Sequence, residues 1–224
     1  MTIFIMVTLS YKGYKMSEIF NFGENVQGYR VKVINEREVR AGAGILFLFG
    51  FISFVNCITT KSLLLTQLFI VMFFLEFIIR VLINPKYAPS LIMGRFMVNN
   101  QVPEYVGAAQ KRFAWSIGLV LATLLLSLTL IFPSSTPVGE ESLHNALIGL
   151  SCITCLVMLY FESVFGICLG CMLYNKFHDD DTQYCAGHVC EKHQREACQK
   201  ISFSQVAVLL FFVLVGVMMT LHYF

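Results

Sequence analysis

Charge is scarce in this sequence. Asp, Glu, Lys and Arg make up 13% of the 224 residues, about half the share found in ordinary soluble domains. Their sum leaves a net charge of +2, and no run of Lys and Arg interleaved with aromatic residues is present. These deficits exclude a typical soluble domain and argue against nucleic acid as a partner.

Several familiar catalytic motifs are also absent. The sequence contains no glycine-rich phosphate loop, no His-Glu-x-x-His zinc motif and no serine nucleophile motif. The first ten residues lack a basic leader and a small-x-small cleavage site, so they do not predict a secretory signal, and Met16 is an alternative start. The commonest nucleotide-dependent and hydrolytic sites are therefore excluded.

Apolar residues dominate instead. They make up 57% of the chain, and the mean hydropathy is +0.70. A hydrocarbon core of about 30 Å needs roughly 20 helical residues, and five stretches are long enough to supply them. The sequence predicts an all-α bundle of about five transmembrane helices, at residues 41–60, 62–83, 113–132, 143–174 and 201–221.

Polar segments divide the chain between these stretches. The middle one, residues 86–110, is expected to hold a short amphipathic helix near 91–98 at the membrane surface. The fourth stretch is too long for one straight crossing, so its last two turns should continue into the interface. The predicted regions are a cytoplasmic arm (1–40), a four-helix membrane core (41–174), a Cys/His-rich loop (175–200) and a fifth transmembrane helix (201–224).

Lys and Arg are unevenly distributed among the polar segments. The amino-terminal arm has six, the middle loop four and the cysteine-rich loop four, while the two remaining loops have one and none. Because basic residues are enriched in cytoplasmic loops, all three basic segments, including the amino terminus, are predicted to be cytoplasmic. The cysteine-rich loop would then lie in a reducing compartment, where structural disulfides are disfavoured.

Three charged residues lie within the predicted helices. Glu76 and Arg80 are four positions apart and therefore share a helical face, so we expect a structural ion pair. Glu162 is expected to pair with Arg40, Arg80 or Lys111, because a charge inside the membrane needs a partner.

Five of the eight cysteines fall between residues 168 and 198. Cys168 and Cys171 form a Cys-x-x-Cys at the end of the fourth stretch, and Cys185 and Cys190 follow in the loop with His188 between them. One hypothesis is a thiol-disulfide relay, in which Cys168 and Cys171 are the primary pair and Cys185 and Cys190 pass oxidation state onward. The alternatives are a zinc site that uses the same four thiols and His188, and thiols that have no chemical role.

The predicted fourth helix determines the surroundings of Cys168 and Cys171. On one continuous helix Cys168 and Cys171 would lie at the carboxyl end, where the partial negative charge disfavours a thiolate. Glu162 would point away from both cysteines unless the helix breaks at Gly166. The earlier motif Cys152-x-x-Cys155 lies among apolar residues, so it is expected to pack as part of the core.

The chain resembles a family of bacterial membrane proteins catalogued as domain of unknown function 4395, over about residues 30–174. The resemblance implies a small helical membrane protein of bacterial type with thiol or sulfur chemistry. The chain departs from the family pattern at Ala88-Pro89, where Ser-Pro is expected, and in the extension from Cys185 to Phe224. The residues that carry it are Asn35 to Arg40, Glu76-x-x-x-Arg80, Lys111 to Ala114 with Ile117-Gly118, and Glu162 with Cys168-Leu-Gly-Cys171.

Together these features favour a multi-pass protein of the bacterial inner (plasma) membrane that transfers disulfides or persulfide sulfur at the membrane surface. Its partners would be membrane lipid and a thioredoxin-like protein, a sulfurtransferase or a larger membrane complex. The rival hypotheses are a non-enzymatic subunit or assembly factor with a zinc site, and a small sulfur-compound transporter. Zinc is the cofactor that fits the cysteine spacing, and a quinone is the weaker alternative.

Overall fold

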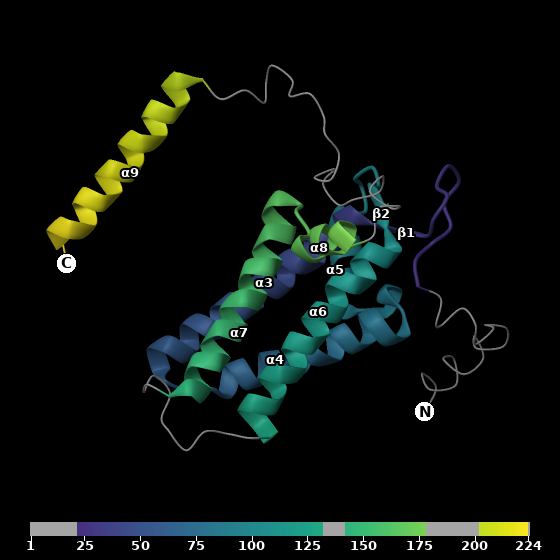
Figure 1. Ribbon diagram of the computed structural model, residues 1–224, viewed down its shortest axis with the longest axis horizontal. Coiled ribbons are helices and arrows are strands. Elements are labelled where there is room, and N and C mark those ends of the chain that lie inside the picture. Colours follow the sequence, from purple (N-terminus) through teal and green to yellow (C-terminus); the bar gives the residue numbers. More distant parts are fainter. Residues whose placement is uncertain (1–21, 132–141, 178–201, 224) are drawn as a thin grey trace, which may run out of the picture. The chain divides into compact units, whose positions relative to one another are not determined.

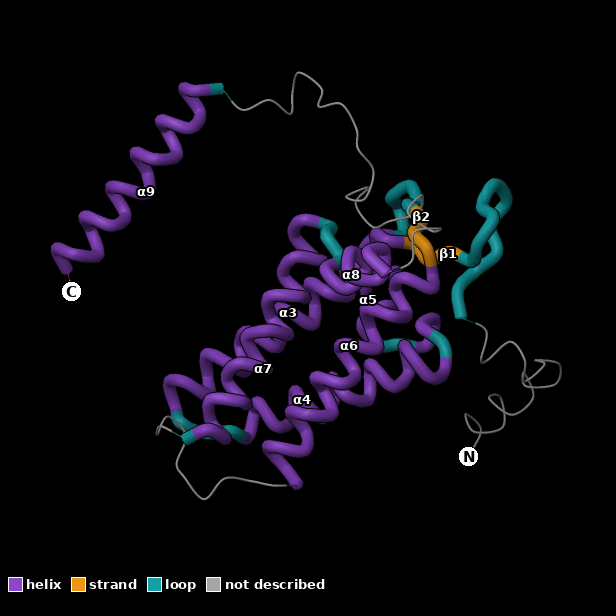
Figure 2. The backbone as a smooth tube through the Cα atoms, viewed as in Figure 1, coloured by secondary structure: helices purple, strands orange, loops and turns teal. Residues whose placement is uncertain are grey.

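The structure is a computed structural model that describes residues 22–131, 142–177 and 202–223. These residues are almost entirely helical (Figure 1 and Figure 2). Four helices are long and apolar enough to cross a membrane, which confirms the predicted all-α bundle of a membrane protein. They cover Glu36–Thr60, Leu64–Ile83, Ala108–Leu130 and Leu143–Phe165.

The first long helix, α3 (Glu36–Thr60), begins earlier than its apolar stretch predicts. The Asn35 side chain caps it by accepting a hydrogen bond from the Arg37 backbone N–H at 3.2 Å. Glu36 and Glu38 occupy the first turn, where negative charge complements the helix dipole. Local capping therefore adds a charged turn ahead of the membrane-spanning part.

The other long helices each end in a π-helical turn. Such turns occur often at functional sites, and the one after α7 contains Glu162. The helices and turns are α4 (Leu64–Ile78, then Ile79–Ile83), α6 (Ala108–Leu126, then Ser127–Ile131) and α7 (Leu143–Tyr160, then Phe161–Phe165).

Short elements gather at one end of the bundle. The helix expected near residues 91–98 is α5 (Pro89–Val98), and it packs against α3. Gly94 permits this contact, because a Cβ there would lie 2.6 Å from the Glu38 carbonyl oxygen. Two strands that the sequence analysis missed, β1 (Val33–Asn35) and β2 (Tyr105–Gly107), pair antiparallel and join the entries to α3 and α6.

The core of the bundle lies between α3, α4, α6 and α7. Phe73, Phe77 and Trp115 are among its buried residues, and the Phe73 and Phe77 rings are 4.4 Å apart between centroids. Gly118 lets α6 approach α4, since a Cβ at this position would overlap the Phe77 ring. The aromatic residues therefore fill the space between the long helices.

The fourth long helix does not run on through the cysteines, and that expectation was wrong. It stops at Gly166, which adopts the left-handed conformation with φ 67°. A separate helix, α8 (Leu169–Phe177), follows and packs against α6. Because of this break, the cysteine pair lies at the start of α8 and not at the end of the fourth long helix.

The last helix, α9 (Phe203–Tyr223), forms a unit of its own. Its described apolar stretch is Phe203–Val215, and nearly all of the side chains described in it are exposed. The helix coincides with the fifth expected span, whose crossing of the membrane stays a prediction.

Candidate functional site

Cys168 and Cys171 lie at the amino-terminal end of α8 and form a disulfide, with their Cα atoms 5.1 Å apart. Cys168 directly precedes the helix, and its carbonyl oxygen accepts a hydrogen bond from the Met172 N–H at 3.0 Å. Its Sγ accepts a hydrogen bond from the Cys171 backbone N–H at 3.3 Å. Cys168 thus occupies the cap position of α8.

This placement reverses the expected electrostatics. The carboxyl end of a helix disfavours a thiolate, whereas the amino-terminal end presents free N–H groups and a partial positive charge. Reactive cysteines of disulfide oxidoreductases use this position, because it stabilises the thiolate. The expectation that the pair lies at a helix carboxyl end was therefore wrong, and the cause is the helix break at Gly166.

Both sulfur-bearing residues are buried. Cys171 is 0% exposed and Cys168 4%, and they pack against Val106 and Ala114. Gly170 brings α8 onto α6, since a Cβ there would lie 2.6 Å from the Cβ of Ala114 and 2.7 Å from its Cα. The packing of α8 on α6 therefore covers nearly all of the surface of the cysteine pair.

A buried three-residue ion cluster lies beside the cysteine pair. Lys111 Nζ is 2.8 Å from Glu36 Oε2 and 2.7 Å from Glu162 Oε1, and the lysine side chain is fully buried. The three residues come from α6, α3 and the turn after α7, so the cluster joins three spans. Of the partners expected for Glu162, Lys111 is the one it contacts, while Glu36 as the second partner was not foreseen.

Arg40 adds a second positive charge to this region. Its Nη2 donates a hydrogen bond to the Val164 carbonyl oxygen at 3.3 Å. A Cβ at Gly166 would lie 2.9 Å from Arg40 Nη1, so the guanidinium lies directly against the glycine that ends the helix. Arg40 therefore supports the helix break at Gly166 that places Cys168 at the start of α8.

A small cavity of about 40 Å³ joins Glu162 of the ion cluster and Cys168, and Cys155 of α7 also lines it. Glu162 and Cys168 both line it, and so does Trp115, which is 2% exposed. The Trp115 Nε1–H has no hydrogen-bond partner among the residues that the structure describes. The rest of the lining is mostly apolar and includes Phe73 and Phe77.

A second buried ion pair stands apart from the cysteines. Arg80 Nε lies 2.8 Å from Glu76 Oε1, and the Ser90 backbone N–H donates to Glu76 Oε2 at 3.2 Å. Ser90 Oγ also contacts both side chains. The Arg80 guanidinium lies 5.1 Å from the Phe77 ring centroid and 5.2 Å from that of Trp115. These contacts satisfy both charges and fix α4 to the start of α5.

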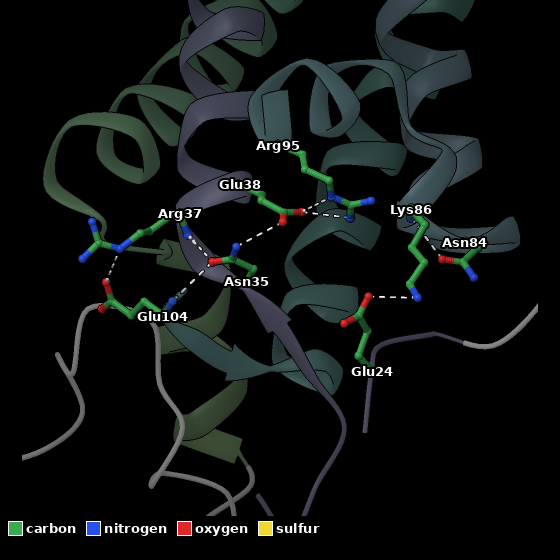
Figure 3. Close-up of polar contacts among 8 residues, drawn as sticks. All are labelled: Glu24, Asn35, Arg37, Glu38, Asn84, Lys86, Arg95 and Glu104. Carbon is green, nitrogen blue, oxygen red and sulfur yellow. Dashed lines mark hydrogen bonds and ion pairs between the residues drawn. The ribbon is translucent and has the colours of Figure 1, made fainter. Parts of the chain in front are cut away.

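A more exposed polar cluster joins α3 to α5 and to the segment before β1 (Figure 3). Glu38 accepts hydrogen bonds from Arg95 Nη2 at 2.9 Å and from Asn35 Nδ2 at 3.1 Å. The bond with Glu38 raises the pKa of the Arg95 guanidinium. Lys86 Nζ is 2.9 Å from Glu24 Oε1, and a cavity of about 340 Å³ lies among these groups. The charges drawn in Figure 3 pair with one another, which suits a structural role.

Other predicted site residues have different outcomes. Cys152 and Cys155 lie within α7 as free thiols, as does Cys57 in α3. Cys185, Cys190 and His188 lie outside the described residues, so the relay pair and the zinc site stay predictions. Within the described ranges, no three His, Cys, Asp or Glu side chains come together in a way that could hold a metal ion.

Comparison with known protein families matches residues 34–178 to DUF4395, a domain of unknown function. The chain belongs to this family. The match spans the four long helices, the ion cluster and the Cys168–Cys171 pair, so the candidate site lies within the family domain. No curated protein and no solved structure matches the chain.

Proposed function

We propose that this protein is a membrane thiol-disulfide oxidoreductase whose working pair is Cys168 and Cys171. The observation that carries the proposal is the position of the pair across the amino-terminal end of α8, with the Cys171 N–H directed to the Cys168 sulfur at 3.3 Å. A helix start stabilises a thiolate, and an easily formed thiolate is what disulfide exchange requires.

The exchange proceeds through a mixed disulfide. A thiolate of a partner dithiol attacks one sulfur of the Cys168–Cys171 bond, and the other cysteine leaves as a thiolate. The second partner thiol then attacks the mixed disulfide and releases the first cysteine. Two electrons and two protons pass from the partner to the protein, and the reverse sequence returns them. When Cys168 is the leaving group, the start of α8 stabilises its charge.

In this proposal Cys185 and Cys190 are the dithiol that exchanges with the buried pair and carries its oxidation state to a thioredoxin-like or other external partner. Movement of α8 is required, because both cysteines of the primary pair are buried. Gly166 at the start of the connection and Gly170 at the α6 contact are the residues about which α8 can move.

We further propose that the site faces the cytoplasm of a bacterial cell. Several basic residues flank the bundle at the cysteine end, and they support this orientation: Arg37, Lys86, Arg95 and Arg112. The turn between α3 and α4 has a single basic residue, Lys61. Membrane-impermeant maleimide tests the orientation: Cys185 and Cys190 should react only after cells are permeabilised. Labelling in intact cells would reverse it.

The function is tested by a redox titration of full-length protein in detergent. One variant keeps only Cys168 and Cys171, with the other six cysteines changed to alanine, and the matched control keeps only Cys152 and Cys155. After equilibration over a range of thiol and disulfide ratios, free thiols are trapped with a large maleimide and counted by gel shift. We expect a reversible two-electron transition for the first variant and none for the control.

Two results would contradict the proposal. A Cys168–Cys171 bond that stays oxidised under every condition is a structural disulfide, and thiols that never form a bond have no redox role. Repeating the titration on wild-type protein with and without a chelator separates the zinc hypothesis, since metal-bound thiols become reactive only after the metal is removed.

A further inference from the structure

We propose that Glu162 accepts and returns the proton of the Cys168 thiol through water held in the cavity between them. This inference rests on the proposed thiol-disulfide exchange and adds the group that handles its protons. It follows from three observations: a shared cavity, an indole N–H without a partner among the described residues, and a carboxylate that already has one cationic partner.

The size and lining of the cavity suit water. One water needs roughly 10–15 Å³ of such space, and the cavity offers about 40 Å³. A buried water also needs two to four polar partners. The Glu162 carboxylate, the Trp115 Nε1–H and the Cys168 sulfur all belong to residues that line this cavity. Water there would satisfy the Trp115 N–H and connect the carboxylate with the sulfur.

The charges around Glu162 allow it to gain and lose a proton. Lys111 from α6 contacts it at 2.7 Å, and Glu36 from α3 shares the same lysine at 2.8 Å. Arg40 from α3 lies against the adjacent Gly166, and Arg80 from α4 lies over the Trp115 ring. When Glu162 is protonated, Lys111 still has Glu36 as its counterion. Neither protonation state of Glu162 leaves the buried lysine unpaired.

The proton step is balanced as follows. During oxidation of the reduced pair, the Cys168 S–H gives its proton through water to the Glu162 carboxylate, and the thiolate attacks a disulfide of the oxidant. The oxidant releases one thiolate, which takes up a proton that Glu162 returns. The Cys171 sulfur then attacks the Cys168 sulfur of the mixed disulfide, and the second oxidant sulfur leaves as a thiol with the Cys171 proton. Two electrons and two protons leave the pair in total.

The test measures how fast the reduced Cys168/Cys171-only variant is oxidised by a small aromatic disulfide between pH 5 and 9. Glu162→Gln keeps the shape and the contact with Lys111 but cannot take the proton, so we expect a rate loss of about 100-fold or more. Glu38→Gln is the control, because Glu38 is a carboxylate in the first turn of α3 that bonds Arg95 instead of Lys111 and is not among the residues that line the cavity. We expect this control to stay within about threefold of the parent, a change too small for loss of a proton-transfer group.

A spectroscopic signal gives an independent readout. Trp115 is the only tryptophan in the chain, so its emission reports directly on the cavity. We expect the emission to titrate with pH in the parent and in Glu38→Gln, and the transition to disappear in Glu162→Gln. Glu162→Asp, which keeps a carboxylate on a shorter side chain, should restore the titration and part of the rate.

Each result decides the inference. Equal slowing by Glu38→Gln and Glu162→Gln would show that the loss of any carboxylate at this end of the bundle is enough to slow the reaction. An unchanged Glu162→Gln rate would exclude proton transfer by this residue. If Glu162→Gln fails to fold, Glu162→Ala replaces it as the variant without a carboxylate, and an unaltered rate and emission profile in Glu162→Ala overturns the inference. A parent pair that never cycles between dithiol and disulfide contradicts the proposed function itself, which the redox titration detects separately.

Discussion

The chain contains two Cys-x-x-Cys motifs with different structures. Cys152 and Cys155 lie one turn apart within α7 and stay free, whereas Cys168 and Cys171 straddle the start of α8 and are joined. Both motifs are largely buried and both lie in the same predicted helical stretch. Spacing alone therefore says little about chemistry, and the backbone around the cysteines sets the difference.

The surroundings of the two motifs differ as well. The first is packed among apolar side chains such as Leu156 and Phe69. The second shares a cavity with Glu162 and has the Lys111 cluster beside it. Cys155 of the first motif also lines this cavity. The feature that only the second motif has is a helix start, which assists thiol chemistry, since Cys152 and Cys155 lie in the interior of α7.

The largest expected effect is on the exchange reaction itself. Cys168→Ala should abolish disulfide exchange, because no second sulfur remains to release the mixed disulfide. The double variant Cys152→Ala and Cys155→Ala should keep the parental rate. The measurement is turnover with a reduced dithiol protein as substrate, and loss of activity in the double variant instead would reverse the assignment of the two motifs.

The next effect concerns the ion cluster beside the second motif. Lys111→Met should lower the free energy of unfolding by about 3–5 kcal/mol, because it leaves the carboxylates of Glu36 and Glu162 buried without a cation. Arg112→Met, at the neighbouring exposed position, should stay within about 0.5 kcal/mol. Denaturant unfolding in detergent compares the two, and equal losses would show that the cluster contributes no specific stability.

A smaller effect tests how closely α8 packs on α6. Gly170→Val should cost about 1–3 kcal/mol, because the new side chain overlaps the backbone of Ala114 and displaces the helix. It should also speed maleimide labelling of reduced Cys168. Gly149→Val is the matched change near the first motif, where nothing beyond the adjacent residues and the helix's own backbone lies within 4 Å of the added Cβ. Unchanged labelling in Gly170→Val would mean that α8 does not shield the pair.

The smallest effect concerns the helix break at Gly166. Gly166→Ala should cost about 1 kcal/mol, since φ 67° is unfavourable for a residue with a Cβ. Gly28→Ala carries a similar backbone cost at φ 94° but lies far from α8 in the sequence. Thermal unfolding should respond to both changes, whereas the redox midpoint of Cys168 and Cys171 should shift only with Gly166→Ala. If both changes shifted the midpoint, the midpoint would not depend specifically on the backbone geometry at Gly166.

Part of the site follows directly from local sequence. Glu76 and Arg80 are four positions apart, so a single helix is enough to bring them together, and the structure joins them at 2.8 Å. The long apolar stretches likewise define the membrane helices without reference to any other part of the chain. These features depend on residues that are close in sequence.

The rest depends on contacts between distant segments. Lys111 and Glu162 are 51 positions apart, and several basic residues were equally plausible partners until the helices packed. The three-residue strands are too short to be detected from composition, and they form because Val33–Asn35 and Tyr105–Gly107 meet at the same end of the bundle.

The sequence by itself determined that this protein is a helical membrane bundle with a Cys-x-x-Cys at the end of its fourth apolar stretch, because apolar length and residue spacing are local properties. Tertiary structure decided which helix end the cysteines occupy. A glycine does not fix a break by itself, and here the contact of Arg40 with Gly166 and the close approach of Gly170 to Ala114 favour a new helix over continuation. That packing turned an unfavourable position for a thiolate into a favourable one.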